Sequence, residues 1–241
     1  MPIVAVQSRR LYREVADQLR RLIRIGEYPT GARLPAERDL ANQLRISRPT
    51  LREALIALEV EGLVNIRVGS GIYVTDPAVM PPKVSHIDGI EGPFELLRAR
   101  EFIEGAIAAE AALKATTSDI QRLDQVLQCM RDLPKDRDAM IAVDRQFHTT
   151  IAAMLGNAVL ERFVTELFDQ RINPYFERLS TYFEDDSTWK SAAIEHRAIR
   201  DAIAAADSNG AKAAMERHLG ASQERFSTNF EEVVSAEEAR T

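Results

Sequence analysis

The chain of 241 residues contains a single cysteine, Cys129. An intrachain disulfide is therefore excluded, and a reducing compartment is expected. No apolar run approaches the roughly 20 residues that a membrane-spanning helix needs. The first ten residues, MPIVAVQSRR, also lack the apolar core of a signal peptide. These absences exclude a disulfide scaffold, and they predict a cytoplasmic protein.

Lysine is absent from residues 1–76, which hold 12 arginines and 9 acidic residues and so have a balance of +3. Residues 77–241 carry 19 basic and 28 acidic side chains, a balance of −9. Hydrophobic residues make up 45% of the chain, as in ordinary globular proteins. The basic front and the acidic rear indicate different partners, and the front suits an anion.

Residues 1–76 predict three short helices followed by a β-hairpin. The apolar positions of residues 11–23 repeat with a helical period. A second helix is expected to begin near Pro35 and to end near Leu44, and Ser47 is expected to cap a third. The runs LVNIRV and IYV, joined by the turn GSG, predict the two strands of the hairpin. This order describes a winged helix-turn-helix.

The segment LPAERDLANQLRISRPTLREALIALEVEGLVNIRVGSGIYV, residues 34–74, resembles the DNA-binding domain of the GntR family of bacterial transcription regulators. Its Arg, Gly and Pro residues stand in the family's register over the whole segment. Arg45 departs from the pattern, because the family usually places Gly in this turn. Arginine is the costlier residue there if the turn needs a positive φ.

The third helix begins with side chains that suit DNA. Its N-terminus attracts phosphate, and an arginine at the major groove can pair with guanine through two hydrogen bonds. The resemblance implies that the base or phosphate readers are Arg38, Arg48 and Arg52, that Ser47 and Thr50 contact the DNA backbone, and that Gly69 contacts DNA at the wing tip. The alternative is a helical surface with solvated arginines.

Residues 77–93 hold four prolines and two glycines and predict a linker. A mainly helical domain is expected over residues 94–228, followed by an acidic tail over residues 229–241. Its expected helices are 94–115, 118–133, 138–155, 158–172, 174–183, 188–206 and 209–227. Ser118 and Gln121 have the spacing of a capping box. The whole chain is therefore mainly α, with a winged helix-turn-helix and an all-α bundle.

Four residues of this domain are typical metal ligands. Asp144 and His148 stand four residues apart on one helix, and both lie beside its apolar stripe. His196 and His218 each lie eleven residues from Asp207, in a turn that joins two helices, so an antiparallel pair places them at the same depth. A buried Asp has to be neutralised. An Asp–His hydrogen bond is one solution; a divalent metal is the other, and the ligand types favour Zn²⁺, with Ni²⁺ or Mn²⁺ as alternatives.

The segments FELLRAREFIEGAIAAEAA, DRQFHTTIAAMLGN and EHRAIRDAIAAADSNGAKAAMERHL resemble the FCD ligand-binding domain of the FadR subfamily of GntR regulators. In many such domains an Asp and three His hold a metal in the effector cavity, and the four residues above fall on those positions. The resemblance also places Arg100 at the cavity, with Glu104 to hold it. Asn157, Arg171 and Trp189 are further candidates for effector binding.

Other segments, among them FDQRINPYFERL, resemble the uronate-responsive regulators of this subfamily. This resemblance implies a homodimeric, metal-containing repressor that binds palindromic DNA and releases it when a hexuronate or related sugar acid binds. Hydroxy acids such as lactate or galactonate, and dicarboxylates, remain alternatives. A metallohydrolase would not explain the winged helix, and a constitutive architectural protein would not use a polar cluster in a helical core. No catalytic residue and no enzyme activity are expected.

Overall fold

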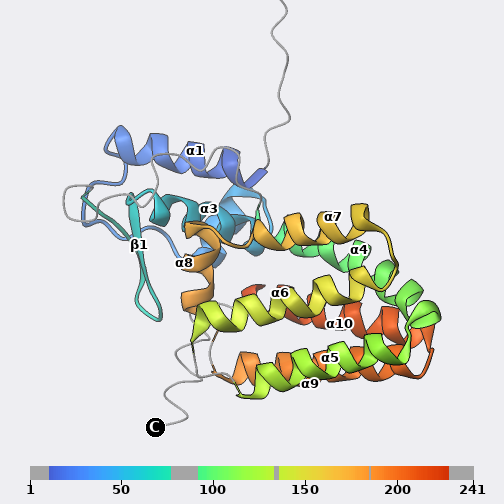
Figure 1. Cartoon of the computed structure of the whole chain (residues 1–241). Coiled ribbons are helices and arrows are strands. Elements are labelled where there is room, and N and C mark those ends of the chain that lie inside the picture. Colours follow the sequence, from blue (N-terminus) through green and yellow to red (C-terminus); the bar gives the residue numbers. More distant parts are fainter. Residues whose placement is uncertain (1–10, 77–91, 133–135, 185, 228–241) are drawn as a thin grey trace, which may run out of the picture. The chain divides into compact units, whose positions relative to one another are not determined.

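The computed structural model describes residues 11–76, 92–132, 136–184 and 186–227 (Figure 1). Two compact units emerge from the contacts within the chain. The first, here called the head, comprises Met1–Gly92, Pro174–Tyr182 and Ser227–Thr241; the second, here called the bundle, comprises Pro93–Asn173 and Phe183–Phe226. Most of the linker predicted over 77–93, and the tail predicted over 229–241, lie outside the described residues.

The head contains the expected winged helix-turn-helix. Its elements are α1 (Leu11–Arg24), α2 (Glu37–Leu44), α3 (Arg48–Val60), β1 (Val64–Arg67) and β2 (Gly71–Val74). The two strands pair antiparallel, with Val64 opposite Val74. Helix α2 begins at Glu37, two residues after Pro35, and Ser47 caps α3 by accepting a hydrogen bond from the Thr50 backbone N–H. Because Leu51, Leu55 and Leu58 are fully buried, α3 forms the centre of the head.

Helix α8 (Pro174–Phe183) is the unexpected member of the head (Figure 1). Sequence analysis placed residues 174–183 in the helical domain, and a helix does form there. However, Pro174–Tyr182 packs with the head rather than with the bundle. Three of its apolar side chains, Tyr175, Phe176 and Leu179, are buried. The chain therefore leaves the bundle, contributes one helix to the head, and returns.

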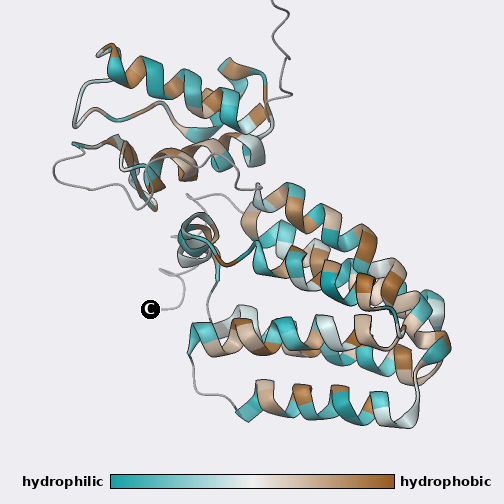
Figure 2. Cartoon of the chain, turned by 45° about the horizontal axis from the view of Figure 1, so that its top comes forward, coloured by the Kyte–Doolittle hydropathy of each residue, from teal (hydrophilic) through white to brown (hydrophobic). Residues whose placement is uncertain are grey.

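The bundle is built from the other helices of the rear domain. They are α4 (Pro93–Lys114), α5 (Thr117–Asp132), α6 (Arg137–Ala153), α7 (Ala158–Asp169), α9 (Asp186–Ala204) and α10 (Ser208–Ser227), all near their predicted bounds. Figure 2 shows hydrophobic and hydrophilic residues interspersed along these helices, as expected when one face of each lies in a core. Within the described part of the bundle there is no strand, which confirms the mainly helical class.

The capping box at the start of α5 differs from the predicted one. Asp119 donates its backbone N–H to the Thr116 hydroxyl, and its own carboxylate accepts from the Thr116 backbone N–H. The prediction of Ser118 with Gln121 was therefore wrong by two residues, because α5 begins at Thr117 and Thr116 is the residue that precedes it.

Arg45 has the backbone conformation that its position in the family predicts for glycine. It ends α2 with φ 55° and ψ 44°, in the left-handed region. A side chain is disfavoured there because its Cβ approaches the following carbonyl oxygen. The short connection between α2 and α3 is thus made at some cost in backbone energy.

We expect Arg45→Gly to raise the free energy of unfolding by about 0.5–1 kcal/mol. The left-handed strain of about 1–2 kcal/mol is removed, and the larger entropy of the unfolded glycine chain offsets part of it. Urea-induced unfolding of both proteins measures the difference. Arg21→Gly, an exposed arginine inside α1, is the matched control and should lose about 0.8 kcal/mol. A loss of stability in Arg45→Gly as well would contradict the account of this turn.

Candidate metal centre and nucleic-acid interface

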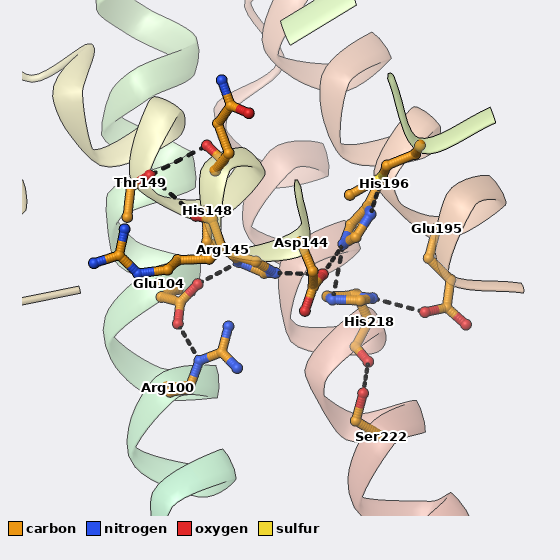
Figure 3. Close-up of polar contacts among 12 residues, drawn as sticks. Arg100, Glu104, Asp144, Arg145, His148, Thr149, Glu195, His196, His218 and Ser222 are labelled. Carbon is orange, nitrogen blue, oxygen red and sulfur yellow. Dashed lines mark hydrogen bonds and ion pairs between the residues drawn. The ribbon is translucent and has the colours of Figure 1, made fainter. Parts of the chain in front are cut away.

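The four predicted ligands come together in the bundle. Asp144 and His148 lie on α6, His196 on α9 and His218 on α10, and all four are buried. One ligand atom from each lies within 4.8 Å of every other. In Figure 3 Asp144 lies among the three imidazoles. The equal spacing of His196 and His218 from the turn at Asp207 therefore predicted their meeting correctly.

The Nε2 atoms of the three histidines lie close to Asp144 or to each other. Asp144 Oδ1 lies 3.3 Å from His196 Nε2 and 3.6 Å from His148 Nε2, and the Nε2 atoms of His196 and His218 are 3.1 Å apart. Ligands bound at about 2.1 Å to one ion, at angles between octahedral and tetrahedral, lie about 3.0–3.4 Å from each other. The separations of 3.1 and 3.3 Å fall in this range and that of 3.6 Å lies just above it, so the set could bind a single divalent ion.

The opposite nitrogens of the imidazoles have partners of their own. His218 Nδ1 is hydrogen-bonded to Glu195 at 2.7 Å, and His148 Nδ1 lies 2.5 Å from Glu104. A carboxylate at Nδ1 holds the proton there and turns Nε2 toward the metal position. Sequence analysis missed Glu195. It adjoins His196 in the chain, but only the crossing of α9 and α10 shows that it faces His218.

Electrostatics favour the ionised carboxylate and the neutral forms of His196 and His218, whereas for His148 burial lowers the pKa but the neighbouring Glu104 outweighs it, so that the pKa is raised. Burial raises the pKa of Asp144, but the nearby imidazoles of His148 and His196 more than offset this, and the pKa falls well below its usual range. Burial lowers the pKa of His218 well below its usual value, and the neighbouring His196 adds to the effect. The pKa of His196 is also lowered, mainly by burial. Ionised carboxylate and neutral imidazole are the forms that bind metals.

His148 is connected to a buried arginine through Glu104 (Figure 3). Arg100 Nε donates to Glu104 at 2.6 Å, and both residues lie on α4. Burial raises the pKa of Glu104, but the opposing effects of Arg100 and His148 are larger and lower the pKa to about 2. The Arg100 guanidinium also lies 4.7 Å from the centre of the Phe168 ring. Arg100, Glu104 and His148 therefore form a continuous polar row that reaches the metal ligands.

The three further effector candidates lie in different surroundings. Arg171 is at the metal ligands, since its Nη1 donates to Asp144 Oδ2 at 3.0 Å. Asn157 is exposed, and its side chain caps α7 by accepting from the backbone N–H groups of residues 159 and 160. Trp189 is half-buried on α9 and takes no part in the described contacts of the ligand set. Of the three, the structure brings only Arg171 to the site.

In the head, five of the six predicted DNA contacts are at least partly exposed. Ser47 is exposed and Thr50 half-buried, and their hydroxyls are 2.7 Å apart at the start of α3. The remaining three are Arg38, whose side chain is 79% exposed, Arg48, which is half-buried, and Gly69, which has φ 70° in the wing turn.

Arg52 differs from the prediction. Its side chain is fully buried, and its Nη2 donates to Glu37 Oε1 at 2.6 Å. Arg48 Nε reaches the same oxygen at 3.3 Å. The two arginines do point the same way, as expected one turn apart, but Arg52 is not exposed for contact with DNA. Its role in this structure is to hold Glu37, which in turn contacts Arg48, because a buried carboxylate needs a cation.

A winged helix-turn-helix head, joined to a helical domain with a buried ligand set, defines a class of protein: the transcription regulators that bind DNA with one part of the chain and carry a second, regulatory domain. Residues 11–74 match the bacterial regulatory proteins of the gntR family, and residues 95–221 match the FCD domain. The chain belongs to the GntR family, with an FCD domain as in its FadR-like members, and this is a family of regulators rather than enzymes.

Two relatives come from Escherichia coli (strain K12). The chain is 38% identical to the Uxu operon transcriptional regulator over 221 residues, which is 89% of this chain and 86% of the relative. It is also 38% identical to the Exu regulon transcriptional regulator over 217 residues, 88% of this chain and 83% of the relative. Among solved structures, E. coli McbR/YncC has the same fold, with a TM-score of 0.50, 21% identity and coverage of 90% of this chain and 97% of that one. No helix in the described parts of the chain has the length and apolar character to cross a membrane.

We expect Glu195→Ala to weaken Zn²⁺ binding about 10- to 100-fold, because His218 loses the carboxylate that orients it. Competition with a chromophoric chelator measures the affinity. Glu110→Ala is the control, since Glu110 is an exposed partner of Lys114 on α4 and should leave the affinity unchanged. Equal Zn²⁺ affinities for wild type and Glu195→Ala would remove Glu195 from the metal centre.

Proposed function

We propose that this protein is a metabolite-responsive repressor. It binds a palindromic operator as a homodimer through its two heads, and it releases the operator when a sugar acid, most simply a hexuronate, binds beside a Zn²⁺ ion in the bundle. The ion is held by Asp144, His148, His196 and His218. Family membership supports DNA binding by the head, and the ligand set supports a metal in the bundle.

The observation that carries an acidic effector is the state of Arg100. Its side chain is fully buried, and among the described residues neither Nη1 nor Nη2 has a hydrogen-bond partner. Leaving charged donors buried and unpaired costs several kcal/mol, so such a group normally has an anion as its partner. Glu104 occupies only the Nε side. A carboxylate that accepts from Nη1 and Nη2 would complete the site.

A sugar acid suits this arrangement because its oxygens differ in chemistry. Bound Zn²⁺ would supply a Lewis acid that attracts carboxylate and hydroxyl oxygens. Arg100 would bind the carboxylate, and Arg171 lies close enough to Asp144 to orient a second oxygen. Resemblance to the uronate-responsive regulators and the 38% identity to the Uxu and Exu regulators support a hexuronate over lactate, galactonate or a dicarboxylate.

Homodimerisation is supported by exposed apolar side chains on two helices that contact each other. Phe102 on α4 is 79% exposed, and Val159 and Phe163 on α7 are 62% and 42% exposed. Large apolar side chains exposed on neighbouring helices are candidates for an interface. A two-fold dimer presents two copies of α3, which matches a palindrome.

On DNA, we expect Arg48→Ala to lose about 1–3 kcal/mol of operator affinity and to relax base preference, because Arg48 is the arginine that remains partly exposed at the start of α3. Titration of an operator duplex and a scrambled duplex at several salt concentrations measures both effects. Arg24→Ala, at the exposed end of α1, is the control. An equal loss on the two duplexes would make Arg48 a phosphate contact, and no loss on either would contradict its assignment.

For the effector, we expect Arg100→Met to bind operator with wild-type affinity and to lose at least 10-fold in response to the acid, because the carboxylate loses its cation. Operator release titrated with glucuronate and galacturonate, with Zn²⁺ present, measures the response. Arg122→Met, an exposed arginine of α5, is the control. A wild-type complex that no acid releases would contradict the sugar-acid assignment. Release of the Arg100→Met complex at the wild-type concentration would contradict Arg100 as the anchor.

A further inference from the structure

Residues Pro174–Tyr182 of α8 belong to the head, and the residues on either side of them in the chain belong to the bundle. Within the head, the Tyr175 hydroxyl donates to the backbone carbonyl of Glu53 on α3 at 2.7 Å. The Tyr175 ring stacks with Tyr12 of α1 at a centroid distance of 6.3 Å. Both rings are buried. The N-terminal half of α8 is thus anchored on the helix that carries Arg48.

The C-terminal half of α8 is held by one buried carboxylate. Glu59 of α3, which is 2% exposed, accepts two hydrogen bonds from Arg178, each of 2.8 Å. It also accepts from the Tyr182 hydroxyl at 2.8 Å and from the Ile66 backbone N–H of β1 at 2.7 Å. We call Glu59, Ile66, Arg178 and Tyr182 the Glu59 cluster. This cluster links α8, α3 and the wing through a single charged group.

Both ends of α8 return to the bundle beside a metal ligand. Arg171 stands just before the helix and Glu184 just after it, and the two form an ion pair at 3.6 Å. Arg171 also binds Asp144 Oδ2 at 3.0 Å, while Asp144 Oδ1 faces the histidines. We call Asp144, Arg171 and Glu184 the Arg171 bridge. One carboxylate of the metal set therefore contacts a residue that stands three positions before the start of α8.

The segment that joins α7 to α8 is short. Only residues 170–173 separate α7 from α8, and α8 is ten residues long. Only Ile172 and Asn173 therefore stand between Arg171 and the first residue of α8. The Glu59 cluster favours movement as a unit, because separating Arg178 from Glu59 would leave a buried charge without its cation.

We propose that α8 transmits the state of the metal and effector site to α3, and that Arg178, Tyr182 and Glu59 are positioning residues in this coupling. An acid bound at the metal changes what Asp144 and Arg171 contact. The Arg171 bridge then resets the base of α8, and the Glu59 cluster carries the change to α3 and the wing. This inference rests on the proposed function, because it needs an effector at the site.

Arg178→Met tests the coupling, because it removes the ion pair and keeps most of the side-chain volume. The test compares operator dissociation constants with and without saturating glucuronate, in Zn²⁺-loaded full-length protein. The duplex is one that wild-type protein selects from a random library. Calorimetry measures glucuronate binding without DNA. We expect at least a 5-fold effect of glucuronate on operator affinity in wild type and less than 2-fold in Arg178→Met. Operator affinity without acid, and glucuronate affinity without DNA, should both stay within 2-fold of wild type.

Arg200→Met is the matched control. It removes ion pairs with Asp124 and Asp201 that belong neither to the Arg171 bridge nor to the Glu59 cluster, and it should keep the full response. Tyr182→Phe removes a single hydroxyl and should give an intermediate response, which serves if Arg178→Met does not fold. If glucuronate weakens operator binding equally in wild type, Arg178→Met and Tyr182→Phe, the role of α8 in the coupling is overturned, but the proposed function is not. If wild-type protein binds the operator but glucuronate does not change its operator affinity, both the proposed effector and this inference are overturned.

Discussion

A negative charge buried in the bundle has to be neutralised, and much of the surrounding structure follows from this. Asp144 is 4% exposed, in a core where an unpaired carboxylate would be costly. The imidazoles of His148 and His196 face one oxygen, His218 lies beside His196, and Arg171 binds the other oxygen. The four side chains come from α6, α9, α10 and the segment after α7. Several elements of the bundle therefore meet around this one buried charge.

The same physical rule applies to three further carboxylates among the described residues. Glu104 is paired with Arg100 and His148, Glu59 with Arg178 and Tyr182, and Glu37 with Arg48 and Arg52. Each carboxylate joins elements that apolar packing alone would allow to slide. A buried ion pair contributes little net stability, but breaking it is costly, so it selects one arrangement over others. Such an arrangement suits a regulator, in which ligands have to choose between distinct states.

The net charge also differs between the two parts of the chain. Residues 1–76 carry a balance of +3 and residues 77–241 a balance of −9. The positive charges that remain partly or fully exposed near the start of α2 and α3, Arg38 and Arg48, suit a phosphate backbone. In the bundle, basic residues such as Lys114 and Arg162 are exposed, whereas Arg100 is fully buried beside Glu104 and Arg171 lies beside the metal ligand Asp144.

The sequence by itself determined the elements and the ligand set. Helical periodicity, the cap at Ser47 and the equal spacing of His196 and His218 from one turn are local features, and local geometry decides which face a residue occupies. Only the tertiary structure decided that Arg52 is buried against Glu37, that Glu195 orients His218, and that α8 packs in the head. The contact of Tyr175 with Glu53 joins residues 122 positions apart. No local pattern encodes such a pairing, because it depends on how whole helices meet, and burial then fixes which charges must find each other.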